Sequence, residues 1–445
     1  MHETISTVNV DFCASVARML HTEMPFSLGE PPEWLDLRLG TDDLPDAYRG
    51  LPVADSHLPF SNVAIFAPGV GWRFTCMWGL AYGLESAVVN FNRFPQLGIA
   101  ITRRCLLGCA AAYFDDELAV ECIRDCDVSQ RNLQLVFKLL GAPPQSSKSF
   151  APAPNRHYLG TSVHVGDFGW LGVIRFQPKT STTMKVQAKL HEAIVTKQLR
   201  PDDAGKLRGD LNWLFSMCAG HAGRFAGPVL AAKQHASSPV LLESEATTLQ
   251  LLSIMLRTAR PRDVEVCSAT KSPLVIYSDA SFENGALRVG WVLMTSPPLG
   301  VSCLVPSEVT DTWITRHQQI YPGETLCGLL VPWVHGDLLE GRDLLWFVDN
   351  EAAVSSLIKG SSGQEDVHTI VQLSHLIFQK RQIRPWIEWI DSASNPSDGL
   401  SRLGIEDSWT QTQPWHLREL SFPVELLFVA KPTDLQPFLS LVNSG

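Results

Sequence analysis

Tyr113-Phe114-Asp115-Asp116 places two adjacent carboxylates between two short apolar runs, residues 105–114 and 118–120. This pattern predicts a strand, a tight turn and a second strand, with both carboxylates at the tip of the hairpin. Two like charges held this close are costly unless a cation neutralises them. Carboxylate oxygens suit Mg²⁺, which often bridges to substrate phosphates. The hairpin therefore predicts a magnesium site that handles phosphates, although Asp is also common in ordinary turns.

Further blocks surround this tetrapeptide in a distinctive order. Residues 43–49 (Asp-Leu-Pro-Asp-Ala-Tyr-Arg) lie upstream, and residues 78–87 lie between the two acidic stretches. Lys148 and residues 158–160 (Tyr-Leu-Gly) follow. In order and spacing, the set resembles the palm of reverse transcriptases. Residues 43–49 resemble motif A, residues 78–87 motif B and Tyr-x-Asp-Asp motif C, while Lys148 stands where motif D has its lysine and residues 158–160 resemble motif E.

This resemblance implies nucleotide addition by two metal ions, which activate the attacking oxygen and neutralise the leaving one. Two Mg²⁺ ions, with Mn²⁺ as a substitute, would be held by Asp43, Asp115 and Asp116. Tyr48 would lie under the sugar of an incoming dNTP, and Lys148 would neutralise the departing pyrophosphate. The other implied contacts to the triphosphate and the template–primer are Asp46, Ala47, Tyr82 and Gly83.

A second series of predicted elements occupies residues 270–405. Apolar runs at 274–277, 289–294 and 301–305 predict three strands, and a helical stretch begins near residue 323. A buried strand, two helices, another strand and a last helix follow at 344–348, 351–359, 367–379, 386–390 and from 398. This is the order of elements in the ribonuclease H fold. Four acids end strands or begin helices in that order: Asp279, Glu324, Asp349 and Asp398.

Four carboxylates that converge on one point can bind two Mg²⁺ ions for phosphodiester hydrolysis. Residues 395–402 (Asn-Pro-Ser-Asp-Gly-Leu-Ser-Arg) are similar to the end of ribonuclease H domains in retrotransposon polyproteins of the DIRS-like and LTR types. Asp at a strand end or a helix N-terminus is also a common cap. The resemblance implies the reverse transcriptase/ribonuclease H region of such a polyprotein, apparently lacking most of the fingers because few residues precede motif A.

We therefore expect an α/β (α+β) fold, with a polymerase palm and a helical thumb or connection followed by a ribonuclease H-like mixed sheet with helices. The expected segments are a palm with truncated fingers (1–164), a thumb or connection (165–262), a ribonuclease H-like domain (270–405) and a tail (406–445). Predicted helices at 185–198 and 204–219 carry several basic residues. They could track a phosphate backbone or form an ordinary solvated face.

Composition bounds the partners. The chain has 445 residues and a net charge of −10, which opposes nucleic-acid binding unless local basic stretches do the binding. The expected partners are an RNA/DNA hybrid, a template–primer and dNTP, and no membrane. The apolar run at 105–114 is too short to span a bilayer. Ten cysteines without a Cys-x-x-Cys pair fit a reduced compartment, cytoplasmic or nuclear, and not a secreted protein.

Two alternatives remain open. Motif B usually reads Leu-Pro-Phe-Gly and then Ala-Pro, whereas this chain has Ala81, Tyr82 and later Val88, and no histidine stands in the loop before Asp398. The chain could be a catalytically impaired or domesticated remnant that only cleaves or binds RNA/DNA hybrids. It could also be a zinc-binding interaction protein, because Cys-x-x-x-Cys pairs can hold zinc; these cysteines are Cys105, Cys109, Cys122 and Cys126.

Overall fold

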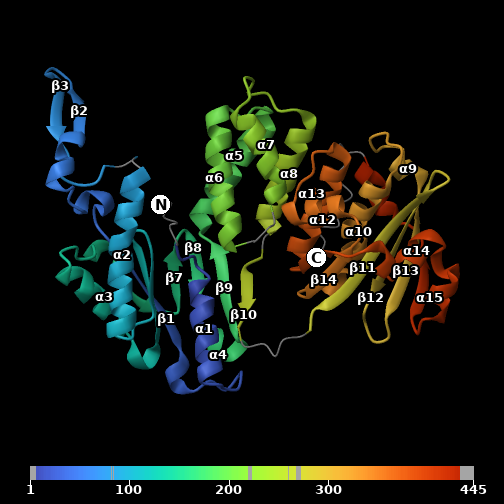
Figure 1. Cartoon of the computed structure of the whole chain (residues 1–445), viewed down its shortest axis with the longest axis horizontal. Helices are drawn as coiled ribbons and strands as arrows, with labels where there is room; N and C mark the ends of the chain where they lie inside the picture. The colour runs from blue at the N-terminus through green and yellow to red at the C-terminus, as the bar shows by residue number, and fades with distance from the viewer. Residues whose placement is uncertain are drawn as a thin grey trace. The chain divides into compact units, whose positions relative to one another are not determined.

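A computed structural model describes residues 7–430 apart from 82, 84, 219–222, 259 and 267–271. The chain divides into two compact units (Figure 1). Unit 1 comprises Met1–Lys179 and Arg262–Ala269, and unit 2 comprises Thr180–Pro261 and Thr270–Gly445. The predicted thumb or connection segment, 165–262, is thus shared: residues 165–179 and Arg262 belong to unit 1, and residues 180–261 to unit 2.

Unit 1 contains two antiparallel four-stranded sheets. The first has the order β4-β5-β1-β6, with β4 at Ala110–Tyr113, β5 at Asp116–Cys122, β1 at Leu37–Asp43 and β6 at Phe150–Ala153. The second has the order β10-β9-β8-β7, with β10 at Arg262–Glu265, β9 at Val173–Pro178, β8 at Thr161–His164 and β7 at Asn155–Tyr158. The helices of this unit are α1 (Phe12–Glu23), α2 (Glu85–Cys105), α3 (Val128–Leu139) and α4 (Phe168–Leu171).

Helices α2 and α3 pack on the first sheet of unit 1. Small alanines on β4 let the helices approach, and the side chains of Leu133 and Phe137 fill the space between. The predicted strand at 105–114 is shorter than expected, because Cys105 ends α2 and the strand begins only at Ala110. Leu107 between them has a positive φ of 55°, which breaks both regular structures.

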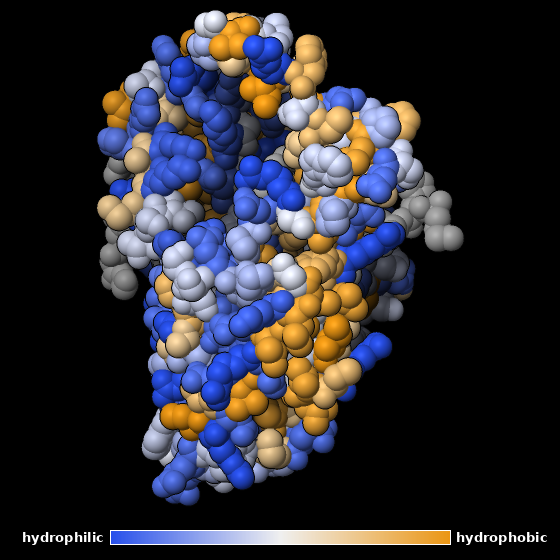
Figure 2. Space-filling view, turned by 90° about the vertical axis from the view of Figure 1, so that its left-hand side faces the viewer, coloured by the Kyte–Doolittle hydropathy of each residue, from blue (hydrophilic) through white to orange (hydrophobic). Residues whose placement is uncertain are grey.

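A hairpin of β2 (Asn62–Ala67) and β3 (Gly71–Cys76) forms a two-stranded sheet by itself. It lies between motif A and α2 in the chain, and Phe66, Trp72 and Phe74 are all exposed on it. Phe66 and Trp72 are paired in register and their rings meet edge to face. Figure 2, which views the side at the left of Figure 1, shows hydrophobic patches among hydrophilic residues.

Unit 2 is built on a six-stranded mixed sheet with the order β15-β14-β11-β12-β13-β16. The first three strands in the chain, β11 (Leu274–Glu283), β12 (Ala286–Leu293) and β13 (Leu299–Val305), run antiparallel to their neighbours in turn. Strands β14 (Asp343–Val348) and β15 (Arg384–Trp389) continue the sheet in parallel from β11. Strand β16 (His416–Leu420) pairs in parallel with β13 and assigns part of the tail to this sheet.

Some helices of unit 2 pack on this sheet, and others pack only on neighbouring helices. α10 packs on β11, α12 and α13, and α14 packs on β11 and β12. The helix α8 of the predicted thumb segment packs on α13, where Gln372 donates a hydrogen bond to Thr248 at 2.8 Å. The helices are α5 (Thr180–Thr196), α6 (Pro201–Cys218), α7 (Gly227–Gln234), α8 (Glu243–Thr258), α9 (Ser307–Thr310), α10 (Ile320–Val334), α11 (Gly336–Leu339), α12 (Glu351–Lys359), α13 (Glu365–Lys380), α14 (Asp398–Arg402) and α15 (Ser408–Thr412).

The predicted fold class is confirmed: the chain is mixed α/β, with a mixed sheet in unit 2. Three strands, helix, strand, helices, strand and helix follow each other between residues 274 and 402 in the predicted order. The predicted hairpin is also present, because Tyr113 of β4 pairs with Asp116 of β5 across a turn made by Phe114 and Asp115. Phe114 adopts a positive φ of 54° in this turn.

Candidate functional sites

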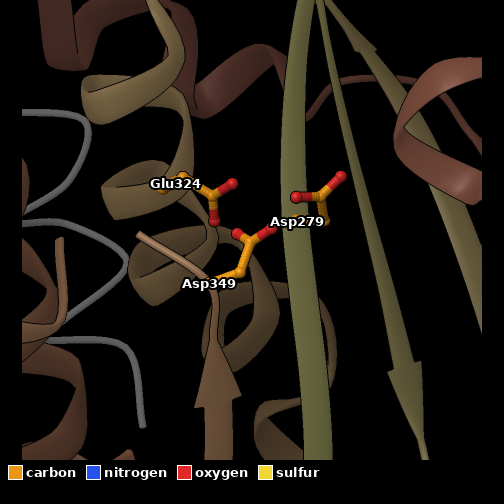
Figure 3. A group of neighbouring side chains, drawn as sticks. All are labelled: Asp279, Glu324 and Asp349. Carbon is orange, nitrogen blue, oxygen red and sulfur yellow. The ribbon is translucent and has the colours of Figure 1, made fainter. Parts of the chain in front are cut away.

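Three of the four acids predicted in unit 2 come together beside the C-terminal end of β14. Asp279 lies within β11, which continues to Glu283 and does not end near residue 279 as predicted. Asp349 follows β14, and Glu324 lies in the second turn of α10. One carboxylate oxygen from each lies within 4.8 Å of the others (Figure 3). The parallel register pairs Ser278 with Val348, so the next residue of each strand reaches the same edge of the sheet. We call these three residues the acidic triad.

Two glycines allow helices to come close enough to complete this site. A Cβ on Gly323, the residue before Glu324, would lie 2.7 Å from Leu287 Cδ1 and 3.0 Å from Ala280 Cβ. A Cβ on Gly290 of β12 would lie 2.6 Å from the main-chain nitrogen of Ser401 on α14. A side chain at Gly323 would push α10 away from the sheet, and one at Gly290 would push α14 away. The two glycines thus set how closely Glu324 and the 398–402 helix approach the sheet.

Burial dominates the electrostatics of the acidic triad. Glu324 is 1% exposed, and its pKa is raised well above the usual range by burial and then by the charges of Asp279 and Asp349. Burial, followed by the charge of Asp349, raises the pKa of Asp279 to about 7. The hydroxyl of Ser401 donates to Asp279 and opposes this rise. Like charges in a low-dielectric site therefore hold protons near neutral pH unless a cation replaces them.

The triad fits a hard divalent cation. Glu324 Oε1 accepts a 2.8 Å hydrogen bond from the main-chain nitrogen of Ala280, while its buried Oε2 has no hydrogen-bond partner. Among the ion pairs of the described residues, none joins Lys or Arg to a triad carboxylate. Three oxygen donors, one of them buried and unsatisfied, are what Mg²⁺ or Mn²⁺ prefers. Asp279, Glu324 and Asp349 are thus the residues that would hold such an ion.

Asp398, the fourth predicted acid, lies beside the triad but outside the group. It begins α14, and its Oδ1 accepts a 2.9 Å hydrogen bond from Nε of Arg402 one turn later. Its charge still contributes to the raised pKa of Asp279. The structure therefore places Asp398 near the triad with its own charge already balanced by Arg402.

Residues that sequence reasoning left without a role hold the triad in place. Asn395 donates from its side chain to the main-chain oxygen of Ser278 at 3.0 Å and is itself buried. Trp346 donates to the hydroxyl of Ser278 at 2.9 Å. Trp389 donates from Nε1 to the main-chain oxygen of Asp349 at 3.1 Å. Asn395 and Ser401 belong to residues 395–402, whose resemblance to ribonuclease H domains already pointed to this site. The sequence around Trp346 and Trp389 predicts only strands.

The acids predicted in unit 1 lie around the β4–β5 hairpin. Asp43 ends β1 and pairs in register with Asp116 of β5. The main-chain nitrogen of Leu44 donates to the main-chain oxygen of Asp115 at 2.9 Å, which ties β1 to the turn. We call Asp43, Asp115 and Asp116 the hairpin trio. Its carboxylates are further apart than those of the acidic triad. Among the described residues, only the triad has three ligand atoms that all lie within 4.8 Å of one another.

Lys148 balances the hairpin trio internally. Its Nζ lies 3.1 Å from both carboxylate oxygens of Asp43. This contact raises the pKa of Lys148, while the ammonium lowers the pKa values of Asp115 and Asp116. Burial outweighs this effect: together with the neighbouring carboxylates it raises the pKa of Asp115 and brings that of Asp116 to about 6.

A pocket of about 180 Å³ opens beside Asp43, Asp116 and Lys148. Two acids that sequence reasoning did not assign, Asp42 and Glu117, also line it. The remaining lining residues are Thr41, Phe150, His157, Tyr158 and Leu159. Tyr158 belongs to the stretch resembling motif E, and its hydroxyl donates to the main-chain oxygen of Asp116 at 3.4 Å.

Asp42 and Glu117 oppose each other in register on the other face of β1 and β5. The side-chain amides of Gln130 and Gln134 on α3 donate to Asp42 at 3.0 and 2.9 Å. Glu117 is fully buried, and neither of its carboxylate oxygens has a hydrogen-bond partner. Burial, then the charges of Asp42 and Asp43, raise its pKa well above the usual range. Its only sequence signal was an acid directly after the Asp-Asp pair.

The other predicted substrate contacts have local roles in the structure. The ring of Tyr48 packs on Phe91, with centroids 4.8 Å apart. Asp46 forms an ion pair with Arg49 at 2.9 Å. Asp46 and Ala47 both have positive φ angles, 56° and 31°. Gly83 has φ 89°, and a Cβ there would meet nothing within 4 Å. Tyr82 lies outside the described residues.

The cysteines around the hairpin do not form a zinc site in the described part of the chain. Cys105, Cys109, Cys122 and Cys126 are free thiols, and no group of three or more such ligands is found among them. Burial is the first cause of the raised pKa values of Cys109, Cys122 and Cys126, which disfavours the thiolate that zinc needs. Separately, none of the described helices combines the length and the apolar character needed to cross a membrane.

No protein-family model matches the chain, and no curated protein matches its sequence. Among solved structures, it is similar to the foamy viral protease-reverse transcriptase dRH in complex with double-stranded DNA, with a TM-score of 0.42 and 11% identity. It is also similar to the foamy viral protease-reverse transcriptase in complex with an RNA/DNA hybrid, with a TM-score of 0.41 and 13% identity. The matches cover 88% and 87% of this chain, but only 60% and 46% of the two neighbours. At these values the likeness is weak, and no function is inferred from it.

Proposed function

We propose that this chain is the reverse transcriptase/ribonuclease H region of a DIRS-like or LTR-type retroelement. It would cut RNA in RNA/DNA hybrids in unit 2 and extend DNA from a template–primer with dNTPs in unit 1. It would act inside the cell, in the cytoplasm or nucleus. The observation that carries the proposal is the acidic triad, because three acids from distant parts of the chain converge on a mixed sheet whose elements follow one another in the order predicted for a ribonuclease H fold.

The residues of unit 2 suit phosphodiester hydrolysis. Asp279, Glu324 and Asp349 would hold two divalent ions, with Asp398 completing the set once Arg402 releases its carboxylate. Ions bound there supply Lewis acidity and an activated water. Asn395 and Trp346 fix Ser278, and Ser401 orients Asp279, so the carboxylates keep their positions when substrate arrives. Positioning of this kind reduces the reorganisation needed at the moment of reaction.

The residues of unit 1 suit nucleotide addition. Asp43, Asp115 and Asp116 would hold the ions, and Lys148, now on Asp43, would move to the pyrophosphate that leaves. The adjacent pocket would take part of the substrate, with the buried Tyr158 as its wall. Tyr48, Asp46, Ala47, Tyr82 and Gly83 remain proposed contacts to the nucleotide and the template–primer.

Two assays on the full chain test the proposal. A labelled RNA/DNA hybrid with Mg²⁺ should yield cut RNA, and a primed template with dNTPs should yield extended primer. Asp349→Asn should abolish the first activity alone, and Asp115→Asn the second alone, while circular dichroism shows an unchanged fold. Absence of hybrid cleavage by the wild type, with Mg²⁺ or Mn²⁺, would refute the proposed function of unit 2.

A second candidate is a remnant that cleaves or binds hybrids without polymerase activity. The looser hairpin trio and the ammonium of Lys148 on Asp43 favour it, since a metal ion must first displace that ammonium. Hybrid cleavage without any primer extension, at every metal concentration tried, would select this candidate over the first.

A further inference from the structure

Trp389 ends β15 at the same edge of the sheet as the acidic triad. It pairs in parallel register with Val348, the residue before Asp349. Its indole nitrogen donates to the main-chain oxygen of Asp349 at 3.1 Å, so one edge of the ring is fixed against a triad residue. The side chain nevertheless remains 45% exposed. A large apolar ring is thus held in one orientation beside the candidate nuclease site, with much of its surface in solvent.

The surroundings of this ring are unfavourable for phosphate but not for a base. The triad, Glu351, Asp391 and Asp398 all carry carboxylates near this end of the sheet, and Asp391 and Glu351 are exposed. A basic side chain at position 389 would be expected to pair with Asp349, as Arg402 does with Asp398. An uncharged aromatic ring can contact nucleic acid without occupying a carboxylate that a metal ion needs.

We propose that Trp389 is a stacking subsite for a base or sugar of the nucleic-acid strand that lies across the acidic triad. The inference rests on the proposed function of unit 2 and names a contact within that site. Stacking on an aromatic ring is independent of base sequence, because every base presents a flat apolar face. The hydrogen bond to Asp349 orients the ring in advance, which lowers the entropy lost when the strand binds. Trp389 is a binding residue, and the carboxylates carry the chemistry.

The test measures hybrid binding by the full chain, with Ca²⁺ in place of Mg²⁺ so that no cleavage interferes. Fluorescence anisotropy of a labelled RNA/DNA hybrid gives the dissociation constant. Trp389→Ala should weaken binding about 5- to 160-fold, the range expected for one lost stacking contact. Trp389→Phe keeps an aromatic face without the indole nitrogen and should recover most of the affinity. The dependence of affinity on salt should not change, because no phosphate contact is lost.

Trp386 provides a matched control on the same strand. It is 69% exposed and points to the opposite face of β15, since it stands three residues before Trp389. Trp386→Ala should leave hybrid binding unchanged. Melting temperatures and circular dichroism of all variants confirm that they fold.

The outcomes separate the subsite from the proposed function. Wild type that binds and cleaves hybrid, with Trp389→Ala equal to it in affinity, overturns the subsite alone. An equal loss in Trp386→Ala also overturns it, because the effect would then belong to the strand and not to this ring. Wild type that neither binds nor cleaves hybrid overturns the proposed function and the subsite together.

Discussion

The two acidic sites of this chain use the same residue type in opposite ways. In the hairpin trio, the ammonium of Lys148 already sits on Asp43, and the carboxyls of Asp115 and Asp116 are only half-buried. In the acidic triad, no Lys or Arg among the described residues pairs with the carboxylates, and Glu324 is almost fully buried. In the hairpin trio, a lysine of the same chain neutralises part of the negative charge. In the acidic triad, the carboxylates repel one another, and a bound cation would reduce that repulsion.

This difference bears on how each site responds to metal ions. An ion entering the acidic triad replaces protons held on Asp279 and Glu324. An ion entering the hairpin trio must also displace Lys148. Metal binding should therefore depend on pH at the first site, and on both pH and a competing side chain at the second.

The largest expected effect separates the two sites. Asp349→Asn should reduce RNA cleavage more than about 1000-fold, because a lost metal ligand removes several kcal/mol of transition-state stabilisation. Primer extension should be unchanged. Glu351→Gln, an exposed acid two residues later, is the control and should cleave normally. If both activities fell together in Asp349→Asn, the comparison between independent sites would fail.

The next effect concerns the stability of unit 1. Glu117 is buried without hydrogen-bond partners, so Glu117→Met should raise the free energy of unfolding of unit 1 by about 1–3 kcal/mol at pH 8. Folded Glu117 keeps its proton, because its pKa is raised, while the unfolded residue loses it above about pH 4.3. The wild type should therefore lose stability as pH rises from there, and the gain of the variant should shrink toward pH 4.

Urea unfolding at several pH values measures this gain. Glu30→Met, at an exposed glutamate of the same unit, is the matched control and should change stability little. A less stable Glu117→Met protein would show that the carboxyl has favourable partners in the fold.

A smaller effect is the pH dependence of metal binding to the acidic triad. Asp279 has a pKa of about 7, so a divalent ion must displace its proton below that pH. The affinity for Mn²⁺ should fall as the pH drops below about 7, by about tenfold per pH unit for each proton that the ion displaces. Calorimetric titration of Mn²⁺ into the Asp115→Asn protein, between pH 5.5 and 8, isolates this site.

Ser401→Ala sharpens the same measurement. The Ser401 hydroxyl stabilises the charged form of Asp279, so its removal should move the transition in Mn²⁺ affinity to higher pH. Affinity independent of pH in the Asp115→Asn protein would contradict the protonated triad.

The smallest expected effect is the shift in pH dependence caused by removing Lys148. Without its ammonium, the pKa values of Asp115 and Asp116 should rise, because Lys148 lowers both. In Lys148→Met, the acid limb of the pH profile of primer extension should therefore shift to slightly higher pH. Lys138→Met, at an exposed lysine on α3, should leave the profile unchanged. A shift to lower pH would mean that Lys148 does not face the hairpin trio in solution.

Much of unit 2 could be predicted because its strands are apolar runs with an acid directly after each run, although β11 continues past Asp279 to Glu283. The closeness of Asp279 and Asp349 follows from this pattern, since the residues directly after paired apolar runs on parallel neighbours lie side by side. The position of Asp398 could not be predicted as well: its distance from the triad depends on Arg402 one turn later and on how closely Gly290 lets α14 approach.

In unit 1, the alternation of side chains along β1 determines which acid faces the site, and the sequence motif alone does not. Asp42 and Asp43 are adjacent, so only one can face the hairpin trio, and the register of β1 with β5 selects Asp43. Asp42 and Glu117 then face α3. A glutamine side chain of that helix donates a hydrogen bond to Asp42, whereas the carboxylate oxygens of Glu117 have no hydrogen-bond partner. The residue types alone do not state this register, because it depends on pairing between strands far apart in the chain.

Strand β16 covers the flank of β13 that would otherwise be the open margin of the unit 2 sheet. The ion pair between Arg288 and Glu419 at 2.5 Å helps to hold it there. A shortened chain ending at residue 405 would keep every predicted nuclease acid, yet it would present the unpaired amides and carbonyls of β13 to other molecules. Such exposed strands template intermolecular pairing. The nuclease half should therefore aggregate when expressed without residues 406–420, even though its chemistry lies elsewhere.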